Sequence, residues 1–592
     1  MSGMLSRRTF LTTTGGAATW TALRGAAAPA ADTPPPNIVF LISDDQGWGD
    51  YGFMGHPHIE TPRLDALAEQ SVTFTNGYVA APLCCPSLAS MITGLHPHQH
   101  KITCNDPPFV GDGRGWPPKR RQLRGEMMAY METSPTLPRL LREKGYASLQ
   151  TGKWWAGHYS SGGFTHGMTH GDMDRGGRHG DVGLTIGRET MEPVETFVAE
   201  AAGTGTPFFL WYAPMMPHLP HTPPERLLEK YRQTTPSIHV ARYRAMCEWF
   251  DETCGQVLDT LDRAGVADNT VVFYICDNGW IQRQNSKLPA PRSKTTSYQG
   301  GVRTPVLVRW PGRIVPRRDD RTPVSAVDLA PTALRLCGLL PTPNMQGVNL
   351  LDREAVDARD AVCGATYSHN AVDIHEPIEN LRERWIVTDD RWKLILPYRL
   401  NKPSAVVQLY DLKADPTEKE NLAEKNRGRI RRLQEKLNDW WGVDDPLPLR
   451  FPEPPPEEIA FDFNYETDGW SPARQLRNLG VTETCLEVES VGDDPILVIS
   501  PCRIDPSGIE RVRVRMAVSA GATAEFHWGT ETEGRIDPGT ELTVPIQADG
   551  AFHEIVFEVG KHPKWTGGPI LRLRLDPTDA PAQIRIDWIR GE

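Results

Sequence analysis

The chain has 592 residues, of which 39% are hydrophobic and 23% charged, and it is long enough for two or three domains of a globular protein. Its formal net charge is −11 and no long basic stripe offsets it, which argues against a nucleic-acid-binding protein. Ten cysteines in a chain of this length exclude a small disulfide-stapled scaffold.

Residues 1–31 have the pattern of a twin-arginine signal peptide. Arg7 and Arg8 precede a mildly apolar stretch and an Ala-x-Ala-like cleavage region. A disordered basic tail is the alternative interpretation. We therefore expect the twin-arginine translocase as a partner and a periplasmic or secreted mature protein. No later segment has the length and apolarity of a membrane span, so we expect no transmembrane segment in the mature chain.

The next part of the chain alternates buried strands with helices. Residues 37–43, 207–214 and 270–279 are continuous apolar runs, which are typical of strands buried on both faces. Residues 241–265 between the last two have helical periodicity. This alternation predicts an α/β sheet, whose ligands bind at the carboxyl ends of its strands.

The pattern changes toward the C-terminus, and the sequence predicts four parts after the signal peptide. A catalytic α/β domain (37–380) is followed by a small α+β subdomain (381–447) and a Pro-rich linker (448–458). Short alternating segments then predict an all-β sandwich (459–592). The sandwich resembles modules appended to carbohydrate enzymes, and we weigh glycan binding and a structural cap equally.

Two polar pairs follow the ends of predicted strands. Asp44 and Asp45 come after the first strand, and Asp277 and Asn278 come after a later one. Either pair alone is better explained as a cap of a turn or helix. Together they supply four hard oxygen ligands at one sheet edge, which favours Ca²⁺ or Mg²⁺ over zinc.

Cys84 stands just before a Pro-Ser pair that opens a short apolar helix over residues 86–93. The thiol therefore lies near the positive end of that helix, where an anionic nucleophile or an anionic substrate is stabilised. For a lone cysteine, a small apolar filler is the alternative.

These residues resemble a known family. The stretch "CCPSLASMITG" is similar to the Cys-x-Pro-Ser-Arg-x-x-x-Leu-Thr-Gly motif of type I sulfatases, in the alkaline-phosphatase superfamily. Order and spacing hold from about residue 37 to 440, through "NIVFLISDDQGWGDYG", "TGKWWAG", "PHLPHTPP", "CDNG" and "SKTTSYQGGVRTPVLVRWPG". The resemblance implies an alkaline-phosphatase-like mixed sheet flanked by helices, with a small α+β C-terminal subdomain and the appended all-β sandwich.

The resemblance also implies roles for individual residues. It implies a divalent cation, most naturally Ca²⁺ with Mg²⁺ as the alternative, and Cys84 oxidised to formylglycine by a formylglycine-generating enzyme. The hydrated aldehyde would attack sulfur and touch the cation. The matching positions are Asp44, Asp45, Asp277 and Asn278 for the metal, Lys153 and Lys294 for the sulfate oxygens, and His218 as the acid at the leaving oxygen.

The chain departs from the family at three positions. Leu88 replaces the arginine that helps hold the modified residue, Trp155 replaces a histidine used in sulfate release, and Gln299 replaces a glutamate. The leading hypothesis is an exported sulfatase acting on sulfated carbohydrate. A phosphodiesterase or phosphonate hydrolase of the same superfamily and a catalytically silent glycan-binding protein are the alternatives. The chemical state of residue 84 separates the sulfatase from the silent protein.

Overall fold

The protein is described by a computed structural model over residues 34–110, 115–452, 457–463, 467–482, 485–530, 536–565 and 568–592. The predicted signal peptide lies outside these residues. The chain forms two compact units, Met1–Pro452 and Glu453–Glu592, which we call the N-terminal unit and the C-terminal unit. None of the described helices is long and apolar enough to cross a membrane.

A nine-stranded mixed sheet forms the centre of the N-terminal unit, in the order β4-β3-β5-β1-β6-β7-β2-β8 with β9 beside β2. Strand β1 pairs in parallel with β5 and β6, whereas β7 runs antiparallel to β6. The strands are β1 Asn37–Ser43, β2 Val72–Tyr78, β3 Ala147–Gly152, β4 His166–Gly167, β5 Phe208–Ala213, β6 Thr270–Cys276, β7 Arg303–Arg309, β8 Arg317–Asp319 and β9 Val324–Ser325.

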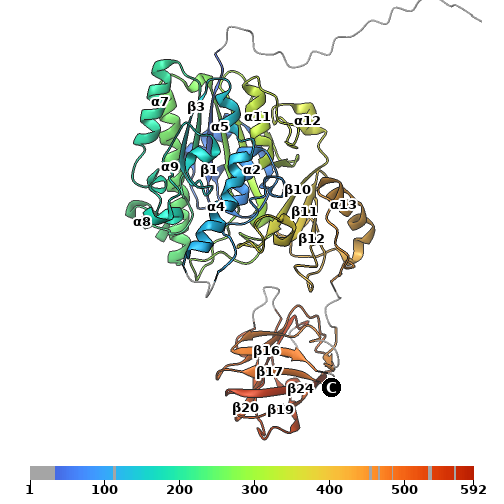
Figure 1. Ribbon diagram of the computed structural model, residues 1–592. Coiled ribbons are helices and arrows are strands. Elements are labelled where there is room, and N and C mark those ends of the chain that lie inside the picture. The colour runs from blue at the N-terminus through green and yellow to red at the C-terminus, as the bar shows by residue number, and fades with distance from the viewer. Residues whose placement is uncertain are drawn as a thin grey trace, which may run out of the picture. The chain divides into compact units, whose positions relative to one another are not determined.

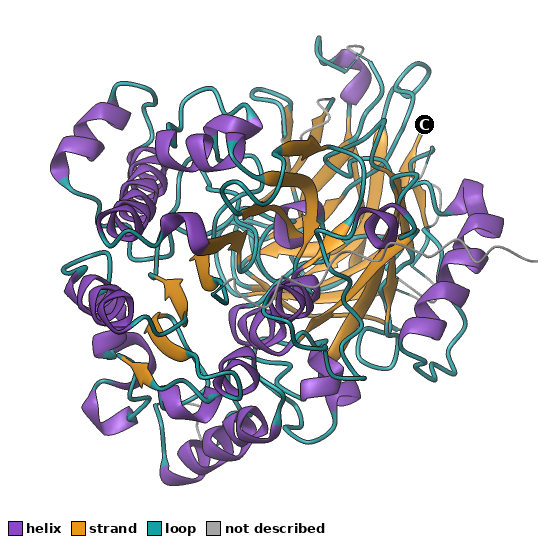
Figure 2. Ribbon diagram, turned by 90° about the horizontal axis from the view of Figure 1, so that it is seen from above, coloured by secondary structure: helices purple, strands orange, loops and turns teal. Residues whose placement is uncertain are grey.

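Helices cover both faces of this sheet (Figures 1 and 2). Alternate residues of β1 enter two separate apolar cores, with Phe40 on one face and Leu41 on the other. Both faces of the strand are thus buried, as its continuous apolar sequence predicts. The helices of this part are α1 Pro62–Glu69, α2 Cys84–Thr93, α3 Pro97–His100, α4 Pro118–Thr133, α5 Leu137–Arg142, α6 Gly177–Gly180, α7 Glu192–Thr204, α8 Glu225–Arg232, α9 Ile238–Arg263, α10 Gln299–Val302, α11 Leu329–Leu336 and α12 Arg353–Asp357.

A four-stranded antiparallel sheet and one helix complete the N-terminal unit. They are β10 Ala361–Tyr367, β11 Leu381–Thr388, β12 Trp392–Pro397, β13 Gln408–Asp411 and α13 Arg427–Trp440. Apolar side chains of α13 pack on β11, β12 and β13 in a core of their own. The predicted start of this subdomain at residue 381 misses β10, which pairs with β11 along its whole length.

Glu418, which follows β13 in the sequence, forms a buried ion pair with this small sheet and also contacts the segment that precedes β7. Lys393 Nζ on β12 lies 2.8 Å from Glu418 Oε1, and both side chains are buried. The contact lacks the alignment of a hydrogen bond and acts through charge. Glu418 Oε2 accepts a hydrogen bond of 2.5 Å from the backbone N–H of Gln299, and its carbonyl accepts one from Arg292. Glu418 therefore connects the small sheet to the start of α10.

Replacing Glu418 with alanine is expected to lower the free energy of unfolding of the N-terminal unit by about 3–5 kcal/mol, because the Lys393 ammonium would stay buried without a counter-charge. Calorimetric unfolding of the full chain measures the change. Glu420→Ala is the matched control, since its pair with Lys425 is exposed and separated by 3.7 Å. That control is expected to change the free energy by less than about 1 kcal/mol. Equal effects of the two substitutions would contradict the prediction.

The C-terminal unit is an all-β sandwich of two antiparallel sheets, in the orders β16-β17-β24-β19-β22, with β14 beside β24, and β15-β18-β23-β20-β21. Alternate residues of the strands fill one apolar core between the sheets. The strands are β14 Ala460–Phe461, β15 Ser471–Arg474, β16 Leu476–Val481, β17 Leu486–Ser490, β18 Ile496–Ile499, β19 Val512–Val518, β20 Thr523–Gly529, β21 Glu541–Pro545, β22 Phe552–Phe557, β23 Arg572–Asp576 and β24 Ala582–Gly591. Mixed sheet, α+β subdomain and sandwich confirm the predicted fold class; glycan binding by the sandwich stays a prediction.

Candidate active site

The two polar pairs meet at the carboxyl ends of neighbouring strands. Ser43 of β1 is in register with Cys276 of β6, so the residues that follow each strand lie side by side. The backbone N–H of Asp45 donates to Asp277 Oδ1 over 3.2 Å, and Asn278 Nδ2 donates to Asp45 Oδ1 over 2.6 Å. Asp44 is buried with these three residues. The structure thus brings together the four oxygen-bearing side chains that the sequence analysis selects.

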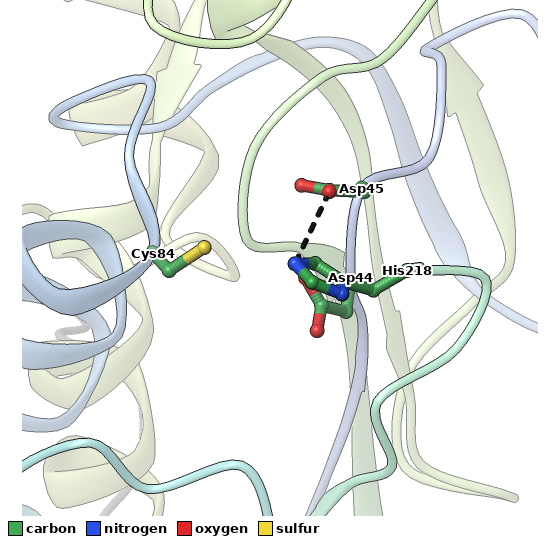
Figure 3. A group of neighbouring side chains, drawn as sticks. All are labelled: Asp44, Asp45, Cys84 and His218. Carbon is green, nitrogen blue, oxygen red and sulfur yellow. Dashed lines mark ion pairs between the residues drawn. The ribbon is translucent and has the colours of Figure 1, made fainter. Parts of the chain in front are cut away.

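Cys84 is the first residue of α2 and faces this group (Figure 3). Its Sγ lies 3.5 Å from Asn278 Oδ1. The side chain is 2% exposed, and every residue of α2 is buried. Burial raises the pKa of the thiol to about 12, although Lys153 and Lys294 oppose the shift. The positive end of α2 therefore points its first side chain at the carboxylates of the two strand ends.

Two lysines contact the carboxylates. Lys153 Nζ donates to Asp44 Oδ1 over 2.5 Å and to Asp277 Oδ2 over 3.1 Å, and Lys294 Nζ donates to Asp45 Oδ2 over 2.8 Å. These five side chains carry three carboxylates against two ammonium groups. The group therefore carries one net negative charge when all five side chains are ionised.

The local backbone places Lys153 at the site. It directly follows β3, whose last residue Gly152 has φ +71° and lies against β5. A Cβ at that position would lie 2.0 Å from the carbonyl oxygen of Ala213. Only glycine permits both the backbone conformation and this approach.

Burial and charge divide the carboxyl pKa values. Burial raises the pKa of Asp44 and, with repulsion from Asp44, raises the pKa of Asp277 to about 6. Burial would also raise the pKa of Asp45, but Lys294, His218 and Lys153 together lower it to about 2. Such separation of pKa values within one buried cluster is typical of functional sites.

His218 closes the group from the loop after β5 (Figure 3). Its Nε2 lies 3.5 Å from Asp45 Oδ2, and its Nδ1 is 2.5 Å from the carbonyl oxygen of Leu219. Because a carbonyl can only accept, Nδ1 carries a proton, and Nε2 faces the carboxylates. Burial lowers the pKa of the imidazole to about 3, so the ring is neutral at neutral pH.

The donor set fits a hard divalent cation. One candidate ligand atom from each of Asp44, Asp45, Cys84 and His218 lies within 4.8 Å of the others. Lys153 contacts only Oδ1 of Asp44; Asp44 Oδ2 is buried without a hydrogen-bond partner among the described residues and is therefore available to a cation. Carboxylate and amide oxygens are the ligands that Ca²⁺ and Mg²⁺ prefer.

Two of the three positions that depart from the family motif, Leu88 and Trp155, carry buried apolar side chains. Leu88 is buried in the core beneath α2. Two cations lie near the Trp155 ring, with Lys153 Nζ 5.7 Å and the Arg178 guanidinium 5.2 Å from its centroid. The ring of His179 is 5.3 Å from the Trp155 ring. The Gly-rich segment of residues 162–181 therefore supplies a wall beside Lys153.

Arg124 and Arg178 were missed by the sequence analysis. Both side chains are nearly buried and both contact Asp106, Arg124 over 3.4 Å and Arg178 through a shorter ion pair. Arg124 also donates to the carbonyl of Trp155 over 2.8 Å. Arg178 belongs to the Gly-rich segment, whose length is typical of functional loops and could have pointed to it, whereas Arg124 lies on α4 with no motif around it.

The cysteine and the histidines that follow Cys84 in the sequence make other contacts. The backbone N–H of Cys85 donates to Asn105 Oδ1 over 2.9 Å, and Cys85 belongs to the apolar core. His96 and His98 pack against Trp440 of α13, and His100 Nε2 contacts Ser90 Oγ over 3.1 Å. These three histidines therefore belong to packing around α2 and α13.

Comparison with known proteins matches two family models, Sulfatase at residues 36–339 and N-sulphoglucosamine sulphohydrolase, C-terminal, at residues 293–440. The chain is 30% identical over 368 residues to N-acetylgalactosamine-6-sulfatase of Homo sapiens, covering 54% of this chain and 65% of that protein. It is 29% identical over 381 residues to arylsulfatase A of Bos taurus, covering 56% of this chain and 70% of that protein. The match thus spans less than two thirds of the human relative.

Solved structures share the fold. Ps i-CgsB in complex with k-i-k-neocarrahexaose superposes with a TM-score of 0.54 at 23% identity, covering 70% of this chain and 95% of that chain. A protein in complex with its substrate D-glucosamine-2-N,6-O-disulfate superposes with a TM-score of 0.54 at 20% identity, and the match covers 70% of this chain and 99% of that chain. The Sulfatase model alone covers more than half of the chain, and the chain therefore belongs to the sulfatase family of the alkaline-phosphatase superfamily.

Proposed function

We propose that the protein hydrolyses sulfate esters of carbohydrates, with Cys84 as formylglycine and a divalent cation, most naturally Ca²⁺, held by Asp44, Asp45, Asp277 and Asn278. The observation that carries this proposal is the convergence of Cys84, at the start of α2, on the oxygen cluster at the ends of β1 and β6. The named activities of the related sulfatases support the same reaction class.

Charge explains why such a site would need a cation. A sulfate monoester is an anion, and a pocket with three carboxylates and two ammonium groups would repel it. A divalent cation held by Asp44, Asp45, Asp277 and Asn278 would reverse the sign of the charge of the site and would polarise a sulfate oxygen. Lys153 and Lys294 lie where their ammonium groups can donate to sulfate oxygens and align the ester for attack.

His218 fits the role of proton donor to the leaving oxygen. Its Nδ1 contact with the Leu219 carbonyl fixes the ring, and its Nε2 faces the cluster. The imidazole is neutral before substrate binds because burial lowers its pKa. The negative charge of a bound sulfate ester raises that pKa, so substrate itself would bring the proton to Nε2.

Formylglycine supplies a hydrated aldehyde as nucleophile in place of a thiol. Because Cys84 and the rest of α2 are buried, the modifying enzyme must act before α2 is packed. We propose a formylglycine-generating enzyme as that partner. We also propose export through the twin-arginine translocase to the periplasm or medium, supported by Arg7 and Arg8 in the sequence.

Peptide mass spectrometry across residue 84 tests the proposal. In protein from a host with the modifying machinery, the peptide is expected to carry an aldehyde in place of the thiol, and the protein is expected to cleave sulfated saccharides faster than phosphate diesters. A thiol at residue 84 in all of the protein, despite competent machinery, would contradict the formylglycine mechanism. Faster cleavage of phosphate diesters would favour the phosphodiesterase alternative.

A further inference from the structure

A second pocket, of about 380 Å³, lies in the N-terminal unit where the loop after β1 meets β2, β7, β8 and the small antiparallel sheet. Its lining carries five basic side chains, namely Arg303, Arg318, Arg321, Arg391 and Lys413. Among the described residues of the lining, only Asp320 and Asp389 oppose them. We call it the arginine pocket. A net positive pocket is notable in a chain whose formal net charge is −11.

Most of these cations lack a carboxylate partner. Arg318 pairs with Asp320 over 3.0 Å. The side chains of Arg321 and Lys413 are exposed and make no ion pair or hydrogen bond with the described residues. Arg391 donates to the hydroxyl of Tyr78 over 3.4 Å and has no acidic partner in the described chain. Positive charge is therefore available to a ligand.

Arg303 is the buried member of the pocket, at 7% exposure. Its Nε donates to the Thr75 carbonyl over 3.1 Å and its Nη2 to Asn76 Oδ1 over 2.8 Å, while the guanidinium lies 3.9 Å from the centroid of Trp48. No hydrogen bond to a described residue is made by its Nη1. Burial, with repulsion from Arg391, lowers the pKa of Arg303 to about 10. A nearby anion would offset both the cost of burying the Arg303 charge and the repulsion from Arg391.

Trp48 links the arginine pocket to the candidate active site. It lies three residues after Asp45, so the two Cα atoms are at most about 11 Å apart. Trp48 also lines a pocket of about 300 Å³ together with Tyr243 and Trp280, and Trp280 follows the Asp277–Asn278 pair. Trp48 thus belongs to the lining of both pockets and lies close in sequence to the first strand end.

We propose that the arginine pocket binds a second anionic group, a sulfate or a carboxylate, of the saccharide whose sulfate ester is cleaved beside Cys84. The identification of the ligand as a saccharide rests on the proposed function. Guanidinium groups match the planar or tetrahedral arrays of oxygens in both anions and bind them in pairs of hydrogen bonds. The ligand class is therefore a saccharide with at least two anionic groups.

The test compares two double variants in a Cys84→Ala background, which prevents turnover. Arg321→Ala/Lys413→Ala removes two exposed cations of the pocket. Arg142→Ala/Lys144→Ala removes two exposed cations, also without side-chain partners among the described residues, at the end of α5 and so matches the change in net charge. Isothermal titration calorimetry measures the Kd of a heparin-derived tetrasaccharide, a hyaluronan tetrasaccharide and maltotetraose.

The pocket variant is expected to bind at least one charged tetrasaccharide about tenfold more weakly than the control variant. If only the affinity for the heparin tetrasaccharide falls, the pocket binds sulfate. If the affinities for the heparin and the hyaluronan tetrasaccharides both fall, a carboxylate is sufficient for binding. Equal Kd values of the two double variants for both charged probes would overturn the proposal. It would also be overturned if maltotetraose, which is uncharged, bound as tightly as the charged tetrasaccharides. Hydrolysis of 4-nitrocatechol sulfate by the unsubstituted, modified protein tests the proposed function separately.

Discussion

Replacing Cys84 with alanine is expected to lower kcat/KM for a sulfate ester by at least about four orders of magnitude, the order found when a covalent nucleophile is removed from a hydrolase. Alanine keeps the Cβ and leaves α2 packed, so the unfolding temperature is expected to stay near that of the parent protein. The oxygen cluster and both lysines would remain, but no group at the start of α2 could attack sulfur. Initial rates with 4-nitrocatechol sulfate measure the loss.

Cys85→Ala is the matched control for that substitution. Cys85 has the same side chain and the same burial, but its backbone N–H contacts Asn105, and its thiol lies within the apolar core. Its removal is expected to leave kcat/KM unchanged. An active Cys84→Ala protein, or an equal loss in the two variants, would show that position 84 is not the nucleophile.

The fold was largely predictable because β1, β5 and β6 are buried on both faces and therefore have continuous apolar sequences. The same regularity located the metal candidates, since residues that follow adjacent parallel strands meet at one edge. β10 was assigned to the wrong side of a boundary, because a seven-residue strand is short and its partner β11 begins fourteen positions after it ends.

The remainder of the candidate site could not be derived from local pattern. Lys153, Lys294 and His218 come from three loops, and only the resemblance to sulfatases selected them. Arg124 gave no signal at all, because a lysine- and arginine-rich helix is usually an exposed one. The charged side chains of the arginine pocket come from four separate segments, so this concentration of charge exists only in the folded chain.

Removing the cation is expected to abolish turnover and to destabilise the N-terminal unit. Asp44, Asp45 and Asp277 would again outnumber Lys153 and Lys294, and repulsion would weaken binding of the anionic ester. After treatment with a chelator, adding Ca²⁺ to 100 times its Kd is expected to stabilise the unit by about 2.7 kcal/mol and to restore activity. Thermal unfolding and initial rates with Ca²⁺ and with Mg²⁺ measure both effects.

Asp45→Asn is expected to remove most of this dependence on Ca²⁺. The low pKa of Asp45, about 2, means that the carboxylate is ionised, so the amide takes away a full negative charge next to Lys294. Asp357→Asn is the control, because Asp357 is exposed and pairs only with Arg353 on α12 among the described residues. It should leave the calcium response intact. The contrary result is full activity of the chelated protein with no shift of its unfolding temperature on adding Ca²⁺ or Mg²⁺. It would mean that the strand-end carboxylates hold no catalytic ion. The two lysines and His218 alone would then neutralise the ester.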